Sequence, residues 1–503
     1  MLTGFPSETK RTGDPANPWL TDNVPPEYLF PAVPVGGQYL TDSAWIPEPG
    51  DVFDGFGVTS SGSPCHPITG AKDGKSKVTW ATARDGSSQI RGAAALCAPV
   101  PARPLGNSRL MKVAVVKERR AFERRVAASP DTVKRMVDMG LEVVAESGAG
   151  GEASFADDAF ATAGASIAPD AATALGAADI VLKVQRPLIG DEAASDELGY
   201  LKRGAVLVGL LQPLRHPAQI EAYASAGITA FAIELLPRIT RAQTMDALSS
   251  QANLAGYKAV LEAADEFGRA FPMMMTAAGT IKAARVLVMG AGVAGLQAIA
   301  TARRLGAIVS ASDVRAAAKE QVESLGATFI TVDEAAARTA ETAEGYAREM
   351  GEDYQRRQRE KITETLKRTD VVICTALIPG RKAPVLLTEA MVAELAPGSV
   401  VVDLAVEAGG NVEGSRVGEV VTTPRGVKII GHANMASRIP VDASQLYARN
   451  LLNFLTLLVG KDGKLRIDTD DEIIRATLLT ENGMVVNPAL APPAPADARA
   501  SVS

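Results

Sequence analysis

The sequence predicts an α/β fold: two Rossmann-like domains with a cleft between them, the second carrying the dinucleotide fingerprint. Three observations favour this fold class. From Met111 onward, short apolar runs alternate with helical patterns, which is typical of parallel sheets. A Gly-x-Gly-x-x-Gly turn at 290–295 directly follows one apolar run and opens a helical pattern. At 503 residues, the chain is also too long for one compact domain.

The composition is that of a globular protein and excludes several function classes. Hydrophobic residues make up 47% of the chain, charged residues 22%, and the net charge is −6. Because no strongly basic surface is indicated, nucleic acid is not an expected partner. No apolar run reaches the roughly 18 residues of a membrane span, so we expect no direct span. The three cysteines, Cys65, Cys97 and Cys374, form neither a metal motif nor a disulfide framework, which favours a reducing compartment.

Residues 1–110 differ in composition from the rest of the chain. They hold 14 of the 30 prolines and all three tryptophans, and they lack sustained periodicity. Such a segment buries too little apolar area to offset its chain entropy. We therefore expect a disordered or non-native extension, with the natural protein beginning at Met111. A small irregular domain built on the tryptophans is the alternative.

The first α/β domain is predicted from residues 111–248 together with 436–487. Its apolar runs predict strands and the patterns between them predict helices. A helical pattern at Ser444–Leu458 follows the second domain and is expected to return the chain to the first. The predicted strands are 112–116, 141–145, 180–184, 205–210 and 229–233, and the predicted helices lie near 130–139 and 155–163.

The second domain is predicted from 249–435 and begins with a long helix over Ser249–Phe267. Apolar runs at 285–289, 307–311, 371–374 and 400–404 predict its strands. The charged segment Ala335–Lys367 reads as a solvated helix, or as a mobile flap around a tyrosine flanked by two glycines. The tail 488–503 is rich in Pro and Ala and is expected to be unstructured.

The glycine-rich turn predicts an adenine-dinucleotide site in this domain. Gly290 makes the tight turn off the strand, Gly292 lets the backbone approach a pyrophosphate, and Gly295 lets the helix pack close to the sheet. Asp313, 18 residues beyond Gly295, stands where a carboxylate accepts ribose hydroxyls. Asp313 favours NAD over NADP because a carboxylate repels a 2′-phosphate, although the nearby Arg315 weakens that preference.

A dense polar loop, 237–251, precedes the long helix. In a two-domain dehydrogenase this loop faces the cleft from the side opposite the glycine-rich turn. Gln243 is suited to hydrogen-bond a nicotinamide carboxamide, and an Arg–Asp pair is suited to order the loop. The alternative is a purely structural loop with Asp246 or Ser249 as the helix N-cap. Of the three histidines only His432 is expected near the cleft, where a structural role competes with one as general base, so the sequence identifies no general base.

From Met111 to about Pro488 the chain resembles the soluble NAD(H)-binding component, domain I, of the alpha subunit of proton-translocating nicotinamide nucleotide transhydrogenase. More narrowly, it is similar to the bacterial form in which this domain is a separate polypeptide. The motifs that carry the resemblance lie at 237–251, 290–298, 312–315, 376–380 and 403–410. The resemblance does not extend to residues 1–110.

The resemblance implies a set of site residues. The family's nicotinamide end corresponds to Arg238, Gln243, Asp246, Ser249 and Leu377. Its adenosine side corresponds to Val293, Asp313, Val314 and Arg315, beside Gly290, Gly292 and Gly295 of the turn. Its mobile loop corresponds to Gly345 and Tyr346, which favours the flap. The resemblance therefore assigns the catalytic roles to Arg238, Gln243, Asp246, Ser249 and Tyr346, and it includes no metal.

The resemblance also implies a function that needs no substrate base. The family passes hydride from NADH directly to NADP bound on a different subunit, and couples this to proton movement through the membrane. We therefore expect NAD(H) here, NADP(H) on a partner subunit, membrane-embedded transhydrogenase subunits as further partners, and a homodimer. The expected location is cytoplasmic, attached peripherally to the inner membrane through these partners.

Two other functions remain open from the sequence. Alanine dehydrogenase shares the two-domain fold, and Arg125 and Lys183 are plausible counterparts of its early Arg and Lys. Its substrate-side histidine has no counterpart in the segment 210–213, which argues against amino-acid oxidation. A non-catalytic NADH-sensing protein is the second alternative, and it predicts binding without hydride transfer to any partner.

Overall fold

A computed structural model of the chain describes residues 110–192, 196–315, 317–330, 352–378, 380–460 and 463–490. It also describes two strands, β1 (Gln38–Tyr39) and β2 (Trp45–Ile46), which pair antiparallel. The chain divides into two compact units, 1–105 and 106–503. The expectation for residues 1–110 falls almost wholly outside the described residues. Among the described residues, no helix combines the length and apolar character needed to cross a bilayer.

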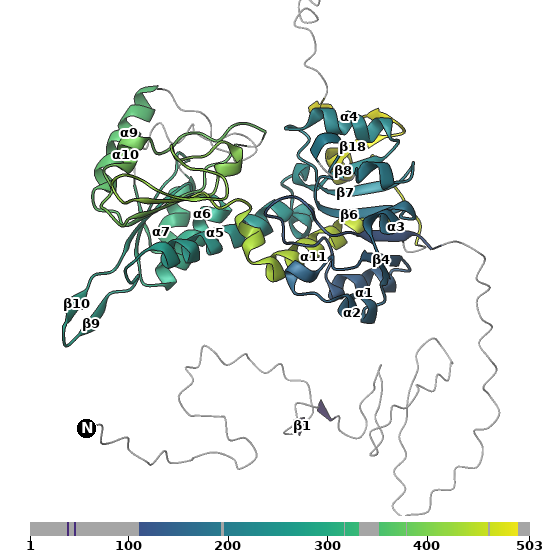
Figure 1. The fold of residues 1–503 in the computed structure, drawn as a ribbon, viewed down its shortest axis with the longest axis horizontal. Coiled ribbons are helices and arrows are strands. Elements are labelled where there is room, and N and C mark those ends of the chain that lie inside the picture. The colour runs from purple at the N-terminus through teal and green to yellow at the C-terminus, as the bar shows by residue number, and fades with distance from the viewer. Residues whose placement is uncertain are drawn as a thin grey trace, which may run out of the picture. The chain divides into compact units, whose positions relative to one another are not determined.

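The first sheet is parallel through its centre and antiparallel at one edge. Its strand order is β19-β18-β8-β7-β6-β3-β4-β5 (Figure 1). Alternate residues of β3 face cores on opposite sides, with Val113 and Val115 in one and Ala114 in the other, so the sheet is buried on both faces. Its strands are β3 (Lys112–Val115), β4 (Glu142–Glu146), β5 (Ser166–Ala168), β6 (Ile180–Gln185), β7 (Val206–Leu210), β8 (Thr229–Ala232), β18 (Leu478–Glu481) and β19 (Met484–Val485).

Helices from both ends of the sequence cover this sheet. They are α1 (Pro130–Asp138), α2 (Asp157–Thr162), α3 (Ala171–Gly176), α4 (Pro217–Ser225), α11 (Pro440–Leu458) and α12 (Glu472–Thr477). Helix α11 returns to the first core as expected, where Phe454 meets Phe231 of β8 with ring centroids 5.6 Å apart. It begins four residues before the predicted start because Pro440 suits the first helical position. The segment predicted as a tail begins with a 3₁₀ turn, Pro488–Leu490, and Leu490 packs against the first domain.

The second sheet is separate from the first, which confirms the prediction of two α/β domains. Its order is β13-β12-β11-β14-β15-β17-β16, with only β16 antiparallel among the described strands. The strands are β11 (Arg285–Met289), β12 (Ile308–Ser312), β13 (Thr328–Phe329), β14 (Val371–Cys374), β15 (Val400–Asp403), β16 (Val420–Thr422) and β17 (Lys428–Ile430). The helices of this region are α5 (Ala247–Glu266), α6 (Val293–Arg304), α7 (Ala317–Ser324), α9 (Glu352–Leu366) and α10 (Glu389–Val392).

Helices α5 and α6 pack with their backbones unusually close. A β-carbon built on Gly256 of α5 would lie 2.0 Å from the carbonyl oxygen of Ala294, in the first turn of α6. Only glycine fits this crossing, since the clash is with backbone. Helix α5, which follows the loop 237–246, therefore packs directly against the first turn of α6.

A buried ion pair ties the connecting segments to the first sheet. The carboxylate of Glu123 accepts two bonds from the Arg125 guanidinium, at 2.7 and 2.8 Å. The same pair reaches Gln251 of α5 through Arg125 Nη1, at 2.8 Å, and Asn434 after β17 through Glu123 Oε2, also at 2.8 Å. Burial opposes ionisation of Glu123, but Arg125 and the other donors hold its pKa at about 2.

A β-hairpin that the sequence patterns did not predict projects beside the second sheet (Figure 1). Strands β9 (Met274–Thr276) and β10 (Gly279–Ile281) pair antiparallel and carry exposed apolar side chains. Met273 is 62% and Met275 79% exposed. A run of three methionines has no alternation of polar and apolar residues, so it gave no strand signal.

Candidate functional site

The glycine-rich turn forms as the sequence predicts, between β11 and α6. Gly290 has φ +103, a conformation that favours glycine. A β-carbon on Gly295 would lie 1.8 Å from the carbonyl oxygen of Gly290, so α6 sits against the turn itself. Thr375, after the neighbouring strand β14, donates its hydroxyl to the same carbonyl at 2.9 Å. The turn is therefore held from two sides.

Two observations fit a pyrophosphate bound at this turn. A β-carbon on Gly292 would meet no atom within 4 Å, so the space above it is open. Gly292 is also the N-cap of α6 and supplies no side-chain cap, so no capping side chain competes with a ligand for the first-turn amides. Val293, the first residue of the helix, is 42% exposed beside this space. Residues 290–295 thus suit the phosphates of NAD(H).

Asp313 follows β12 and is joined to the turn. Its Oδ2 accepts from the backbone N–H of Ala291 at 2.7 Å and from Arg315 Nη2 at 2.9 Å. Its Oδ1 accepts from the backbone N–H and Nε of Arg315, at 2.8 and 3.0 Å. A carboxylate offers about four acceptor positions, and these bonds engage them. A ribose hydroxyl would therefore share Asp313 with Arg315 or displace it; the half-buried Val314 lies between them in sequence.

The segment after β14 is shaped by a side chain that sequence reasoning left out of the site. Asn411 is fully buried; its amide donates to the carbonyls of Ala376 and Pro384, at 2.9 and 2.8 Å, and accepts from Ala376 N–H at 3.0 Å. Asp403 in turn accepts from the backbone N–H of Asn411 at 3.0 Å. Leu377, beside this clamp, is 51% exposed. An asparagine closing a Gly-Gly-Asn turn was the only sequence signal for it.

The predicted nicotinamide loop lies on the first domain as a 3₁₀ turn, η6 (Thr240–Met245), leading into α5. Asp246 is the N-cap of α5, accepting from the backbone N–H of Ser249 at 2.9 Å and from its hydroxyl. Arg238 and Gln243 are exposed, whereas Ala242 and Met245 are buried. The described part of the chain offers the Gln243 amide no hydrogen-bond partner. The loop is anchored and presents Gln243 outward.

Its anchors come from the C-terminal part of the chain. Asn450 and Asn453 of α11 both donate to the carbonyl of Thr244, at 2.9 and 3.0 Å. Arg241 forms a two-bond ion pair with Asp471, the N-cap of α12, at 2.6 and 2.7 Å. An Arg–Asp pair was expected to order the loop; in the structure its aspartate, Asp471, lies 230 residues beyond Arg241 in the sequence. These contacts fix the backbone on both sides of Gln243.

The predicted site residues form two groups. The turn, Asp313 and Arg315 are joined by hydrogen bonds, and Asp246 and Ser249 are joined at the start of α5. The rise of an α-helix separates Asp246 from the Gly256 crossing by about 15 Å. Among the described residues no hydrogen bond links Gln243 to the turn. Gly345 and Tyr346 lie outside the described residues, so their assignment remains a prediction.

The two cations compared with alanine dehydrogenase are occupied by the chain's own carboxylates. Arg125 is held by Glu123, as described above. Lys183 is buried with Glu197 at 3.0 Å and Glu118 at 3.2 Å. Burial raises the pKa of Glu118, an effect that Lys183 opposes. A substrate carboxylate would have to displace one of these internal partners.

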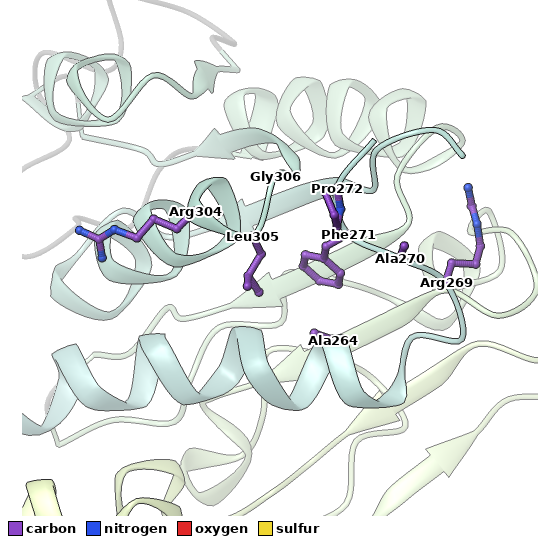
Figure 2. A pocket seen from close by; sticks show the side chains of 8 residues that line it. All are labelled: Ala264, Arg269, Ala270, Phe271, Pro272, Arg304, Leu305 and Gly306. Atoms are coloured by element: carbon purple, nitrogen blue, oxygen red, sulfur yellow. The ribbon is translucent and has the colours of Figure 1, made fainter. Parts of the chain in front are cut away.

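A shallow hollow of about 540 Å³ lies away from this site (Figure 2). Its lining includes Leu305 and Gly306, just before β12, and Phe271, whose carbonyl accepts from the backbone N–H of Ala284 just before β11. It therefore lies at the amino ends of these strands, whereas the turn is at their carboxyl ends. Figure 2 shows Phe271 and Leu305 in the hollow, with Arg269 and Arg304 directed to either side. Nucleotides bind at the carboxyl ends of open parallel sheets, so this hollow is not the nucleotide site.

Replacing Asp313 with alanine is expected to weaken NADH binding. The change removes a ribose acceptor and the bond to Ala291 N–H, together about 1–3 kcal/mol. Wild type is expected to prefer NADH to NADPH. Calorimetry with both nucleotides measures this, with Asp265→Ala, an exposed site on α5, as the matched control. Equal affinities of wild type for NADH and NADPH would contradict the assignment of Asp313.

Comparison with known proteins gives a consistent family relation. Residues 114–255 match the alanine dehydrogenase/PNT N-terminal domain, and residues 259–488 match the alanine dehydrogenase/PNT C-terminal domain. The first part of the NAD(P) transhydrogenase alpha subunit of Rhodospirillum rubrum is 58% identical over 76% of this chain and 99% of its own length. The transhydrogenase structure from Sinorhizobium meliloti is 50% identical, with a TM-score of 0.67 over 75% of this chain and all of that one. Alanine dehydrogenase of Bacillus subtilis is 29% identical over 76% of this chain and 94% of its own.

Proposed function

The chain belongs to the NAD(P) transhydrogenase alpha-subunit family, and on that premise we propose that it binds NADH and passes hydride to NADP⁺ held by a partner subunit. The observation that carries the proposal is the pairing of one open glycine-rich turn with an anchored loop that presents Gln243. Bound NADH supplies the hydride in this reaction. Gly292 and the first turn of α6 bind its phosphates, Asp313 its adenosine ribose, and Gln243 and Leu377 its nicotinamide end.

The proposed reaction needs no general base. Hydride moves between two nicotinamides, NADH becomes NAD⁺ and NADP⁺ becomes NADPH, so no proton is exchanged with a side chain. Neither histidine of the described residues suits such a role. His432 pairs with Glu262 at 3.4 Å, and burial together with Arg438 lowers its pKa. The protein's contribution is then binding and orientation.

We further propose the partners that this reaction requires. The described residues hold one Gly-x-Gly-x-x-Gly turn, whereas exchange between two nucleotides needs two sites. The second site belongs to an NADP(H)-binding subunit, and membrane-embedded subunits couple the exchange to proton translocation from the cytoplasmic face of the inner membrane. A second copy of this chain is the expected occupant of the exposed methionine hairpin, since solvent-exposed apolar patches mark association surfaces.

Hydride transfer in a reconstituted mixture tests the proposal. The purified chain with NADH and NADP⁺ is expected to produce no NADPH, and addition of an NADP(H)-binding transhydrogenase subunit is expected to start production. An alanine-plus-NAD⁺ assay serves as the arm for amino-acid oxidation, which the ion-paired Arg125 and Lys183 disfavour. Transfer by the chain alone, or tight NADH binding with no transfer to the added subunit, would contradict the proposal.

A further inference from the structure

Glu234 is half-buried at the carboxyl edge of the first sheet, and only one of its two carboxyl oxygens has a hydrogen-bond partner. Glu234 follows β8 and leads into the loop that carries Gln243. Its Oε1 accepts from the backbone N–H of Gln212, in the segment after the neighbouring strand β7. Its Oε2 is buried and has no hydrogen-bond partner among the described residues. Such a group is costly to bury, which calls for an explanation.

Gln212, whose backbone N–H donates to Glu234, is in an uncommon conformation. Gln212 has φ +50, in the left-handed region that few non-glycine residues occupy. Its carbonyl accepts from the backbone N–H of Arg215 and His216, at 3.0 and 3.1 Å, closing the segment 211–216 into a turn. The bond from Gln212 to Glu234 helps to keep this turn in place. Strain of this kind persists only where surrounding contacts impose it.

This turn contacts the second domain beside the exposed Leu377. A β-carbon built on Gly380 would lie 2.9 Å from Leu214 Cδ1, so the leucine packs against the glycine backbone. Arg215 Nη2 donates to the carbonyl of Arg381 at 3.5 Å. The Asn411 clamp holds Ala376 on one side of Leu377, and the turn 211–216 contacts Gly380 and Arg381 on the other side. A shift of the turn would therefore move the backbone next to Leu377.

We propose that Glu234 is a positioning residue for hydride transfer, acting through the turn 211–216 on residues 376–378 and 380–381, and that its ionisation displaces this turn. The inference rests on the proposed function for its catalytic readout only. A neutral carboxyl group tolerates a buried, unpartnered oxygen better than a carboxylate does. Once Glu234 is ionised, its Oε2 must be solvated by water, so the carboxylate moves. The backbone of Gln212 moves with the carboxylate, because its N–H donates to Oε1.

The surroundings of Glu234 favour its protonated, neutral form. Burial raises its pKa to about 7, against backbone hydrogen bonds that lower it. The titratable groups that sense its charge are Tyr223 of α4 and Tyr447 of α11, whose own phenol pKa values burial raises. Among the described residues, no ion pair includes Glu234. Glu234 therefore changes its protonation state near neutral pH.

The sign of the stability effect follows from the raised pKa. Between the usual pKa of 4.5 and about 7, folded Glu234 keeps its proton while the unfolded chain loses it. Stability contributed by the neutral group is therefore complete below pH 4.5, declines as the pH rises to about 7, and stays lost above it. Glu234→Gln imitates the neutral acid at every pH. Its melting temperature should exceed that of wild type by a few degrees at pH 8 and match it at pH 5, about 2–5 °C in all.

The test measures melting temperature, NADH affinity and hydride transfer to an added NADP(H)-binding subunit from pH 5 to 9. In wild type the transfer rate is expected to fall roughly tenfold between pH 6 and 8, relative to Glu234→Gln. Glu234→Ala, which removes the acceptor for Gln212, should transfer slowly at every pH. Glu221→Gln makes the same chemical change on the exposed face of α4 and should follow wild type throughout.

The outcomes separate this proposal from the proposed function. If Glu234→Gln follows wild type at every pH in both melting temperature and transfer rate, the proposal is wrong. If wild type transfers no hydride at any pH, the proposed function fails, and the melting and NADH-affinity curves of the variants still decide the role of Glu234. Parallel curves for wild type, Glu234→Gln and the control Glu221→Gln would then overturn it, and a selective alkaline gain in the melting temperature of Glu234→Gln would support it.

Discussion

A chain carrying Gly292→Ala is expected to keep the wild-type melting temperature and to bind NADH roughly 100-fold more weakly. A β-carbon at Gly292 meets no protein atom within 4 Å, and the backbone there lies outside the left-handed region, so the fold has no reason to respond. The methyl group instead occupies the space above the first turn of α6, where backbone must approach the pyrophosphate. Calorimetry with NADH and a thermal melt measure the two effects separately.

Gly295→Ala, three residues along the same turn, should lose NADH binding too but, unlike Gly292→Ala, should also lose stability. Its β-carbon would lie 1.8 Å from the Gly290 carbonyl oxygen, which is backbone and cannot rotate away. Helix α6 must move off the turn, at a cost of about 3 kcal/mol or more, and NADH binding is lost with the geometry. A clear fall in melting temperature is the expected result.

Gly151→Ala supplies the matched control for both changes. Gly151 lies in the first domain and has open space around its α-carbon, as Gly292 has. It should bind NADH and melt as wild type does. A Gly292→Ala variant that binds NADH with unchanged affinity would remove the turn from the nucleotide site.

Gln243→Asn is expected to slow hydride transfer to the partner's NADP⁺ by about 100-fold while changing NADH affinity by less than about threefold. Shortening the side chain by one methylene withdraws the amide by about 1 Å or more, and displacements of that size have such effects on rate. Stability should not change, because the amide is exposed and the backbone on either side is held by Asn450, Asn453 and Asp471. Stopped-flow measurements of transfer, beside NADH titrations, test the prediction.

The same substitution at an exposed helix position is the control. Gln321→Asn on α7 should leave transfer unchanged. If Gln243→Asn melts early and transfers at the wild-type rate per folded molecule, Gln243 stabilises the loop and has no part in orienting the nicotinamide.

Local sequence patterns were sufficient for most of the framework. The apolar run ending at Met289, the glycines after it and the second run at 307–311 predict β11, α6 and β12, because each depends on neighbours in sequence. The long helix was predicted over Ser249–Phe267 for the same reason; it begins two residues earlier, at Ala247, because Asp246, one of the two N-cap candidates, caps it. These elements carry most of the expected nucleotide contacts.

The remaining parts depend on residues that are distant in sequence. Thr375 secures Gly290 from 85 residues away, and Asn411 clamps Ala376 from 35 residues away. Such pairings arise only once strand order and register place two loops together, and no local pattern encodes that. Sequence analysis missed Glu234 for the same reason. A glutamate after a strand is expected to be solvated unless the neighbouring strand end is known to cover it.

The path of the chain through the first domain has a consequence for biosynthesis. Strands β3–β8 emerge first, but helix α11, which contributes Tyr447, Leu451 and Phe454 to their core, follows about two hundred residues later. At typical rates of translation that interval is roughly 10–40 s. The nascent chain meanwhile carries an uncovered apolar sheet face, and the second domain, whose strands are contiguous, can finish before the first. The part begun earliest is therefore completed last, and chaperone binding during synthesis should concentrate on the face that α11 later covers.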